Sequence, residues 1–400
     1  MLTNRQLFLL HMGQTSPSPM MVEIVRAEGI YMYGPDGKEY IDLISGVSVS
    51  NTGHCHPRVV EAVKNQVDAY MHLMVYGEMI QSPQVKYAER LTSILPPALN
   101  NCYFVNSGSE AVEGALKLAK RFTGKSRIIS FRNSYHGGTH GALSIQGNEL
   151  YKNSFRPLLP ETFQIGFNDE KSLDAIDGKT ACVIIEPVQG EAGVICPENS
   201  FLIKVRDRCT ATGAMLIFDE IQTGFGRTGY MFAMERYGVV PDILLLAKAL
   251  GGGMPLGAFI SSKEIMSALI SNPVLGHITT FGGHPVCCAA GLASLNVIID
   301  EHLVESCNLK SVLFKNELTH PLISEVRGDG LLLAVQLIES DYVKYVIAHA
   351  PEYGLILDYF LFCNNAFRIA PPLIISEQEI SKACIRMKKL LDASMNNARN

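Results

Sequence analysis

Two oppositely charged residues follow separate apolar runs in the middle of the chain. Lys248 comes shortly after the run Ile243–Leu246, and Asp219 ends the run that begins at Met215. A lysine at the end of a buried strand loses hydration, which lowers its pKa and makes the neutral amine available. A neutral amine can attack an aldehyde and form an imine. The alternative interpretation is a lysine whose alkyl chain carries its charge to the surface.

Asp219 favours the chemical interpretation. Both residues would lie at the carboxyl ends of neighbouring strands, where the ligands of open α/β sheets bind. An ionised carboxylate at that place can keep a pyridine nitrogen protonated, and a protonated ring is a better electron sink. Glu220 would point to the opposite face, because successive strand residues alternate, so an acid/base pair with Asp219 is not expected. The sequence therefore predicts an amine and a carboxylate at one aromatic ring.

A phosphate cradle is expected between a predicted strand and a predicted helix, in the segment from Val105 to Glu110. Gly108 permits a tight turn, and Ser107 and Ser109 offer hydroxyl groups. The first turn of a helix also presents N–H groups that have no partner within the helix and suit an anion. The alternative is an ordinary helix cap in which Glu110 completes a capping box.

Elements that could position these residues follow from the apolar pattern. Near-continuous apolar runs are typical of strands covered on both faces, and they occur at 102–105, 128–131, 182–185, 215–218, 243–246 and 257–260. Between the first two runs, apolar residues from Ala111 to Phe122 recur at helical spacing. This alternation predicts an α/β fold with a mostly parallel central sheet, which we place in a large domain at residues 60–300.

The pattern changes after residue 300. An apolar run at 331–335, a break at Pro371–Pro372 and a final amphipathic segment containing Ile380 and Leu391 indicate a smaller α+β region. Near the start of the chain, Gly34–Gly37 has the composition of a turn. Residues 1–59 and 301–400 are therefore predicted to form a second, smaller domain.

Composition excludes several classes of partner. The chain has 400 residues, of which 47% are hydrophobic, which is enough for a large core. A net charge of −5 gives no reason to expect nucleic acid or an anionic membrane as a partner. No apolar stretch is long enough to span a bilayer. The ten cysteines contain no CxxC pair, which is typical of free thiols in a reducing cytosol, and a cytoplasmic location is expected.

Two further patterns resemble binding motifs. Gly224–Gly229 matches GxGxxG, but a dinucleotide-binding turn should follow its strand directly and open a long helix, and residues 219–223 intervene here. His136 and His140 have the spacing of a metal-binding pair on a helix, but Gly137, Gly138 and Gly141 disfavour a helix there. Neither a nicotinamide or flavin site nor a metal site is expected.

Taken together, the motifs resemble those of the class III aminotransferases, the ornithine, acetylornithine and 4-aminobutyrate type, which use pyridoxal 5′-phosphate (PLP) and have fold type I. The matching stretches occur in the family's order over roughly residues 30–375. They are Gly53–Pro57, Asn106–Ala111, Ser134–Gly137, Glu186–Glu191, Asp219–Gly224, Lys248–Gly253, Thr280–Gly283, and Arg368 near Pro371–Pro372.

The resemblance implies roles for single residues. Lys248 would form the Schiff base with PLP and move the proton, and Asp219 would pair with the pyridinium nitrogen. Other implied cofactor-binding residues are Ser107, Gly108 and Ser109 at the phosphate, Tyr135 stacked on the ring, Gln222 at the ring hydroxyl, and Glu186. Thr280 would reach the phosphate in the neighbouring subunit, which implies a homodimer with shared active sites.

For the substrate, the resemblance implies that Arg368 binds a carboxylate and that Glu191 neutralises it when no carboxylate is bound. The implied reaction moves an (ω-)amino group from an amine or amino-acid donor to an oxo acid such as 2-oxoglutarate. The alternatives are an aminomutase or racemase on the same scaffold, or a PLP-binding module without catalysis. One position departs from the family: its usual His-Gly-Arg reads His136-Gly137-Gly138 here, so Gly138 cannot hold a donor carboxylate.

Overall fold

A seven-stranded sheet forms the centre of the computed structural model, which describes residues 2–198 and 200–397. The strand order is β4-β10-β9-β8-β7-β5-β6; β10 runs antiparallel to the other six strands, which are parallel to one another. The strands are β4 (Asn101–Val105), β5 (Arg127–Phe131), β6 (Thr162–Ile165), β7 (Thr180–Ile185), β8 (Met215–Asp219), β9 (Ile243–Leu246) and β10 (Gly257–Ser261).

Helices cover both faces of this sheet, which explains its unbroken apolar runs. Ile217 packs into the cluster beneath α5 (Gly108–Thr123), whereas Leu216 and Phe218 pack into the larger cluster on the other face. The helix α7 (Phe201–Thr212) lies against β7 and β8. The α/β class with a mostly parallel central sheet, predicted from the sequence, is confirmed.

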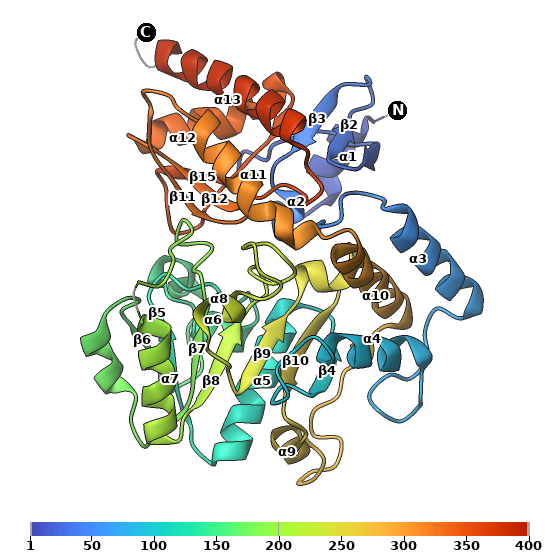
Figure 1. Cartoon of the computed structure of the whole chain (residues 1–400), viewed down its shortest axis with the longest axis vertical. Helices are drawn as coiled ribbons and strands as arrows, with labels where there is room; N and C mark the ends of the chain where they lie inside the picture. Colours follow the sequence, from blue (N-terminus) through green and yellow to red (C-terminus); the bar gives the residue numbers. More distant parts are fainter. Residues whose placement is uncertain (1, 199, 398–400) are drawn as a thin grey trace.

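Two smaller four-stranded sheets lie at one end of the molecule, where the blue and red ends of the chain meet (Figure 1). One has the order β1-β2-β3-β13 and the other β11-β12-β15-β14. Their strands are β1 (Arg26–Glu28), β2 (Tyr31–Tyr33), β3 (Glu39–Asp42), β11 (Ile323–Asp329), β12 (Leu332–Leu337), β13 (Leu355–Ile356), β14 (Asp358–Tyr359) and β15 (Ala366–Ile369).

The parallel pairing of β13 with β3 joins the beginning of the chain to its last quarter. Lys382 adds an ion pair with Glu39 at 2.9 Å across the same junction. These contacts support a domain built from residues 1–59 and 301–400, and that division stays a prediction. The turn expected at Gly34–Gly37 is present, because the N–H of Gly37 donates to the carbonyl of Gly34 at 3.0 Å.

The remaining α-helices lie along the rest of the chain. They are α1 (Asn4–His11), α2 (Ser45–Ser48), α3 (Pro57–Ala69), α4 (Ser82–Thr92), α6 (His140–Ser144), α8 (Ala233–Tyr237), α9 (Lys263–Met266), α10 (Pro285–Asp300), α11 (Leu303–Glu317), α12 (Ser340–His349) and α13 (Glu377–Asn397). The final amphipathic segment is the long helix α13, and it buries Ile380 and Leu391 as expected.

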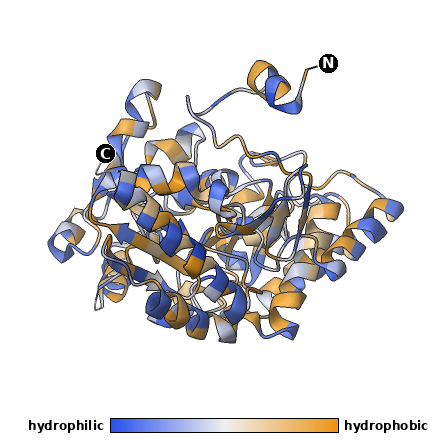
Figure 2. Ribbon diagram, turned by 90° about the horizontal axis from the view of Figure 1, so that it is seen from above, coloured by the Kyte–Doolittle hydropathy of each residue, from blue (hydrophilic) through white to orange (hydrophobic). Residues whose placement is uncertain are grey.

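The first helix, α1, lies outside the core. Figure 2 shows α1 set apart from the body, and none of its residues is buried.

Across the described ranges, no single helix is long and apolar enough to cross a membrane. The consecutive helices α10 and α11 pass that test only as a pair, with a bend of 68° between them.

One strand of the central sheet was not predicted. The edge strand β6 (Thr162–Ile165) pairs only with β5 and is buried only at Ile165, so its residues carry little of the continuous apolar signal. Phe122 has the helical spacing of the buried residues before it, but it is 44% exposed because it lies in the last turn of α5.

Candidate active site

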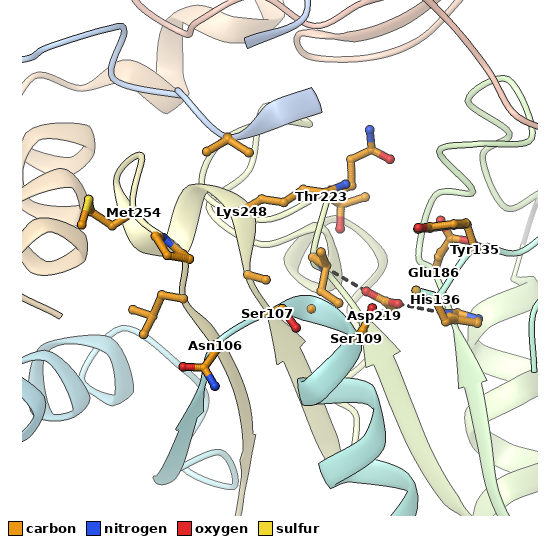
Figure 3. A pocket seen from close by; sticks show the side chains of 18 of the residues that line it. Asn106, Ser107, Ser109, Tyr135, His136, Glu186, Asp219, Thr223, Lys248 and Met254 are labelled. Carbon is orange, nitrogen blue, oxygen red and sulfur yellow. Dashed lines mark hydrogen bonds and ion pairs between the residues drawn. The ribbon is translucent and has the colours of Figure 1, made fainter. Parts of the chain in front are cut away.

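A cavity of about 520 Å³ opens where the strands β8 and β9 and the helix α5 converge (Figure 3). Its lining includes the end of β8, the turn after β9, the first turn of α5 and the loop before α6. The carboxyl ends of parallel strands are the usual ligand site in such sheets. The lining residues predicted from the sequence are Ser107, Gly108, Ser109, Tyr135, Glu186, Asp219, Gln222 and Lys248.

Lys248 is the first residue of a short helical turn (Lys248–Gly251), and it lies two residues after the end of β9. Its φ of +52° lies in the left-handed region, which is strained for a residue with a side chain. Burial lowers the pKa of its amine. Glu191, Asp219 and Glu186 act in the opposite direction, and Arg368 adds to the lowering. A buried amine with a lowered pKa is suited to attack a carbonyl carbon.

Asp219 ends β8, the direct neighbour of β9, as the sequence predicts. Its Oδ1 accepts a hydrogen bond from the N–H of Ile221 at 3.1 Å, and its Oδ2 lies 2.7 Å from Nδ1 of His136. The side chain of His136 is fully buried. Two directional contacts therefore fix the carboxylate in the cavity (Figure 3).

His136 is a site residue that sequence reasoning missed, since the sequence suggested only a metal pair with His140. His140 instead opens α6, and its side chain is exposed. Within the described ranges, no group of three or more potential ligand side chains could hold a metal ion. The pairing of His136 with Asp219 has no signal in their spacing, because His136 lies in the loop between β5 and α6 whereas Asp219 ends β8.

Ser107 caps α5, and its Oγ accepts from the N–H of Glu110 at 3.2 Å. The N–H groups of Gly108 and Ser109 lie in the first turn of this helix, where no intrahelical acceptor exists. A side chain at residue 108 would come within 2.9 Å of Ile221. The first turn therefore offers free N–H donors at the positive end of the helix dipole, and this arrangement suits a phosphate.

Glu186 holds the wall of the cavity around Tyr135. Its carboxylate accepts from the N–H of Tyr135 at 3.0 Å and from the N–H of Gly190 at 3.2 Å. Burial and the nearby Asp219 raise the pKa of Glu186 well above its ordinary value. The amide Nε2 of Gln222, which also lines the cavity, is buried and has no hydrogen-bond partner among the described residues. An orphaned donor that lines a cavity indicates a missing acceptor.

Four successive residues with positive φ shape another part of the wall. They form α2 (Ser45–Ser48), and the next residue, Val49, lines the cavity. Asp42 accepts from the N–H of Ser45 at 2.7 Å, and the hydroxyl of Ser45 donates to the carbonyl of Ala370 at 2.7 Å. Such strained backbone persists only where surrounding contacts hold it, and it is common at functional sites. The sequence did not reveal this turn.

Arg368 and Glu191 form the pair expected from the sequence, next to the cavity rather than in its lining. Nη2 of Arg368 lies 2.6 Å from Oε1 of Glu191, and their side chains are 1% and 8% exposed. The other oxygen of Glu191 accepts from the N–H of Leu361 at 3.1 Å. Both charges act on the pKa of Lys248, so the pair belongs to the same electrostatic environment as the amine.

Thr280 does not join the other residues. It is exposed, lies in the loop before α10, and does not line the cavity of its own chain. Gly138 is also exposed, and a side chain built there would meet nothing within 4 Å. Its N–H donates to the hydroxyl of Ser109 at 3.1 Å, which places it beside the first turn of α5.

The residues present fit PLP. A phosphate needs the free N–H groups of α5, a pyridinium nitrogen needs a fixed carboxylate such as Asp219, and a ring hydroxyl needs a donor such as the orphaned amide of Gln222. An aldehyde needs a buried amine, which Lys248 provides. Fold and site together define a PLP-dependent enzyme of fold type I.

Comparisons with known proteins narrow this class. A family described as "Aminotransferase class-III" matches residues 12–391. The acetylornithine aminotransferase of Methanopyrus kandleri is 41% identical over 389 residues, which cover 96% of this chain and 97% of that protein. The acetylornithine aminotransferase of Clostridium acetobutylicum is 40% identical, with 90% and 93% covered. The chain belongs to the class III aminotransferases, and its cofactor is pyridoxal 5′-phosphate.

Solved structures agree with the fold. The ornithine aminotransferase from Toxoplasma gondii superimposes with a TM-score of 0.91 at 30% identity, with 99% of this chain and 97% of that chain covered. A transaminase from the marine bacterium Virgibacillus gives a TM-score of 0.92 at 28% identity, with 98% and 99% covered. The chain is therefore a PLP-dependent aminotransferase, as the motifs predicted.

Proposed function

We propose that this aminotransferase moves a terminal amino group from an amine or amino-acid donor to an oxo acid such as 2-oxoglutarate. The observation that carries the proposal is the pair of Arg368 and Glu191, a buried cation that is already neutralised and lies close enough to influence Lys248. Such a cation can bind the carboxylate of an oxo acid when Glu191 turns away. When an amine without a carboxylate binds, Glu191 keeps the charge of Arg368 neutralised.

PLP supplies, when bound, an aldehyde that accepts amines and a ring that withdraws electrons. The chain positions the reaction around it. Lys248 would hold the cofactor's aldehyde and would act as the base that moves a proton, a role that its lowered pKa supports. Asp219 keeps the ring nitrogen protonated, and His136 holds Asp219 in place. Tyr135 provides a flat face for the ring.

The remaining residues bind and orient. The first turn of α5, with Ser107, Gly108 and Ser109, holds the phosphate through N–H and hydroxyl groups. Gln222, whose amide Nε2 has no partner among the described residues, would donate to the ring hydroxyl, and Glu186 holds the backbone of Tyr135. Arg368 binds the acceptor's carboxylate bidentately.

The donor is not assigned by the names of the relatives. The relatives described above are named acetylornithine aminotransferase and ornithine aminotransferase. In this chain Gly138 stands in open space where the family's arginine would hold a donor carboxylate. We therefore propose an ω-amine donor whose recognition does not depend on a carboxylate at that position.

The test is absorbance and product analysis of the purified protein loaded with PLP. An amine donor should bleach the band of the lysine-bound cofactor, and 2-oxoglutarate should restore it while one glutamate forms for each amine consumed. Failure of every amine in a broad panel to change the spectrum would refute transfer. Turnover of a single substrate without any oxo acid would instead indicate an aminomutase or racemase.

We also propose a homodimer with shared sites. The support is the position of Thr280, which is exposed outside its own cavity and is flanked by the exposed side chains of Ile278 and Phe281. Mixing Lys248→Ala and Thr280→Ala subunits should restore activity, because half of the mixed sites would combine an intact lysine with an intact partner threonine. Monomers in light scattering, or mixtures no more active than their parts, would exclude shared sites.

We propose a cytoplasmic location because all ten cysteines are free, and free thiols are typical of a reducing compartment. Fractionation of cells that produce the protein, with activity recovered in the cytosolic fraction, would test this location.

A further inference from the structure

The segment Gly224–Gly229 carries an arginine that is buried without a bonded carboxylate in the described ranges. Arg227 is 0% exposed, and its guanidinium donates four hydrogen bonds, all to neutral oxygens. All four come from Nη1 and Nη2, whereas Nε has no partner among the described residues. Burial lowers the pKa of Arg227 to about 10, so the side chain stays charged at neutral pH. A buried charge without an ionic partner costs stability, and its directional bonds must offset that cost.

Nη1 of Arg227 binds one end of the strand pair that carries Arg368. It donates to the carbonyl of Leu331 at 2.9 Å and to the carbonyl of Pro371 at 2.6 Å. Leu331 directly precedes β12, and Pro371 follows β15, the strand that contains Arg368 and pairs with β12. Because β12 and β15 are antiparallel, both contacts lie at the same end of the pair. One nitrogen therefore holds the end of the strand on which Arg368 lies.

Nη2 of Arg227 contacts the strained segment in the cavity wall. It donates to Oδ1 of Asn51 at 2.5 Å and to the hydroxyl oxygen of Ser45 at 3.2 Å. The hydroxyl of Ser45 in turn donates to the carbonyl of Ala370, which directly follows β15. The side-chain amide of Asn51 donates to the carbonyl of Phe225 at 2.8 Å. The wall segment therefore links the end of β15 to the segment of Arg227 a second time.

Arg227 also belongs to the segment that forms part of the cofactor end of the site. This segment begins at Asp219, the last residue of β8, and its residue Gln222 lines the cavity. Its backbone is bonded to the smaller sheet as well, since the N–H of Leu331 donates to the carbonyl of Arg227 at 2.9 Å. The residues expected to bind the ring and the arginine expected to bind a carboxylate are therefore joined through Arg227.

We propose that Arg227 is a positioning residue, which fixes Arg368 relative to the cofactor and so determines how well acceptors with a carboxylate react. This inference rests on the proposed function, because it takes Arg368 as the group that binds the acceptor's carboxylate. Bidentate binding of a carboxylate depends on geometry, and a misplacement of about 1 Å can reduce a rate by about 100-fold. An acceptor without a carboxylate does not use Arg368 and should not respond to such a displacement.

The experiment measures single turnovers of the protein loaded with pyridoxamine 5′-phosphate, with either 2-oxoglutarate or pentanal as the acceptor. Pentanal is the carbonyl product of 1-aminopentane and has no carboxylate. Arg227→Lys keeps the charge but loses the planar fork of donors. The ratio of the rate constant for 2-oxoglutarate to that for pentanal should fall about ten-fold. An equal loss with both acceptors would show a merely structural role and overturn the inference.

Arg208→Lys is the matched control. Arg208 lies in α7, and its guanidinium also donates to two backbone carbonyls, those of Ile176 and Asp174. This variant should leave the ratio unchanged, and a ten-fold fall here would contradict a specific effect of Arg227. Ser45→Ala removes only one of the four bonds of Arg227, so the ratio should fall about three-fold even if Arg227→Lys does not fold. An unchanged ratio in a folded Ser45→Ala protein would count against the link.

A double variant tests whether Arg227 acts through Arg368. In an Arg368→Lys protein the bidentate contact is already lost, so adding Arg227→Lys should lower the ratio by less than about two-fold more. Losses that multiply would mean that the two arginines act independently, and the inference would be wrong.

The same measurements separate the two levels of the hypothesis. If Arg368→Lys alone leaves the ratio unchanged, Arg368 does not bind the acceptor's carboxylate, and the proposed function fails at that point. If Arg368→Lys lowers the ratio but Arg227→Lys does not, the proposed function stands and only the role of Arg227 is wrong.

Discussion

The cofactor end and the substrate end of the site are built in different ways. Asp219 and Lys248 lie at the ends of two neighbouring strands of one sheet, and Ser107 begins the helix that packs beneath it. Arg368 and Asp358 face each other across two short strands of a separate sheet, and Glu191 comes from a loop. The strand ends of one sheet position the residues that react with the cofactor. The strand register of a second sheet, together with a loop, positions the residues that would select the substrate.

This difference predicts two kinds of mutational effect. Changes at the cofactor end should reduce the reaction of every donor and acceptor, because each reaction uses the same amine and ring. Changes at the substrate end should alter the preference among substrates while chemistry continues.

The largest effect is expected at Lys248. Lys248→Ala removes both the nucleophile and the base, so kcat should fall by more than about 10³-fold for every substrate pair. Steady-state glutamate formation measures the loss, and Lys171→Ala, at an exposed lysine, is the control. Survival of normal turnover would exclude the assigned role of Lys248.

A smaller general loss is expected at Asp219. Asp219→Asn keeps the shape but removes the charge that holds the ring nitrogen protonated, and kcat should fall by roughly 10² to 10³-fold. His136→Ala should lose about ten-fold through the buried hydrogen bond to Asp219 at 2.7 Å. If the loss at either position differed strongly between donors and acceptors, the division into a general end and a selective end would be wrong.

At the substrate end, Arg368→Lys should act mainly on the acceptor. The lysine keeps the charge next to Glu191 but cannot form two parallel bonds to a carboxylate, so KM for 2-oxoglutarate should rise roughly ten-fold. The rate at which 1-aminopentane reduces the absorbance band should change much less. Measuring both half-reactions separately checks this, and equal losses in the two would contradict a selective role.

Much of the cofactor end could be predicted from the sequence because its signals are local. Each of Ser107, Asp219 and Lys248 adjoins an apolar run, and these runs became β4, β8 and β9. Parallel strands bring such ends together without further information. The contact of His136 with Asp219 could not be predicted, since it depends on how a loop closes over the sheet.

The substrate end was predicted only in part. Arg368 and Glu191 came from the resemblance and do pair in the structure. The ion pair of Arg368 with Asp358 could not be predicted from the sequence. It depends on the register of a two-residue strand, and so short a strand has no periodicity to recognise. The edge strand β6 (Thr162–Ile165) was missed for the related reason that it is only partly buried.

The smallest effect tests the one departure from the family. Gly138 has open space around its missing side chain and a φ outside the left-handed region, so Gly138→Arg should fold without strain. The new cation beside the first turn of α5 should attract a donor carboxylate.

KM for N-acetylornithine should therefore fall about three- to ten-fold, as for an exposed charge-assisted contact, relative to 1-aminopentane. Gly138→Gln, of similar length and without charge, is the control. An equal gain with Gln would show that the added side chain acts by packing, and no gain with Arg would show that the donor's carboxylate, when it has one, lies at the Arg368 end instead.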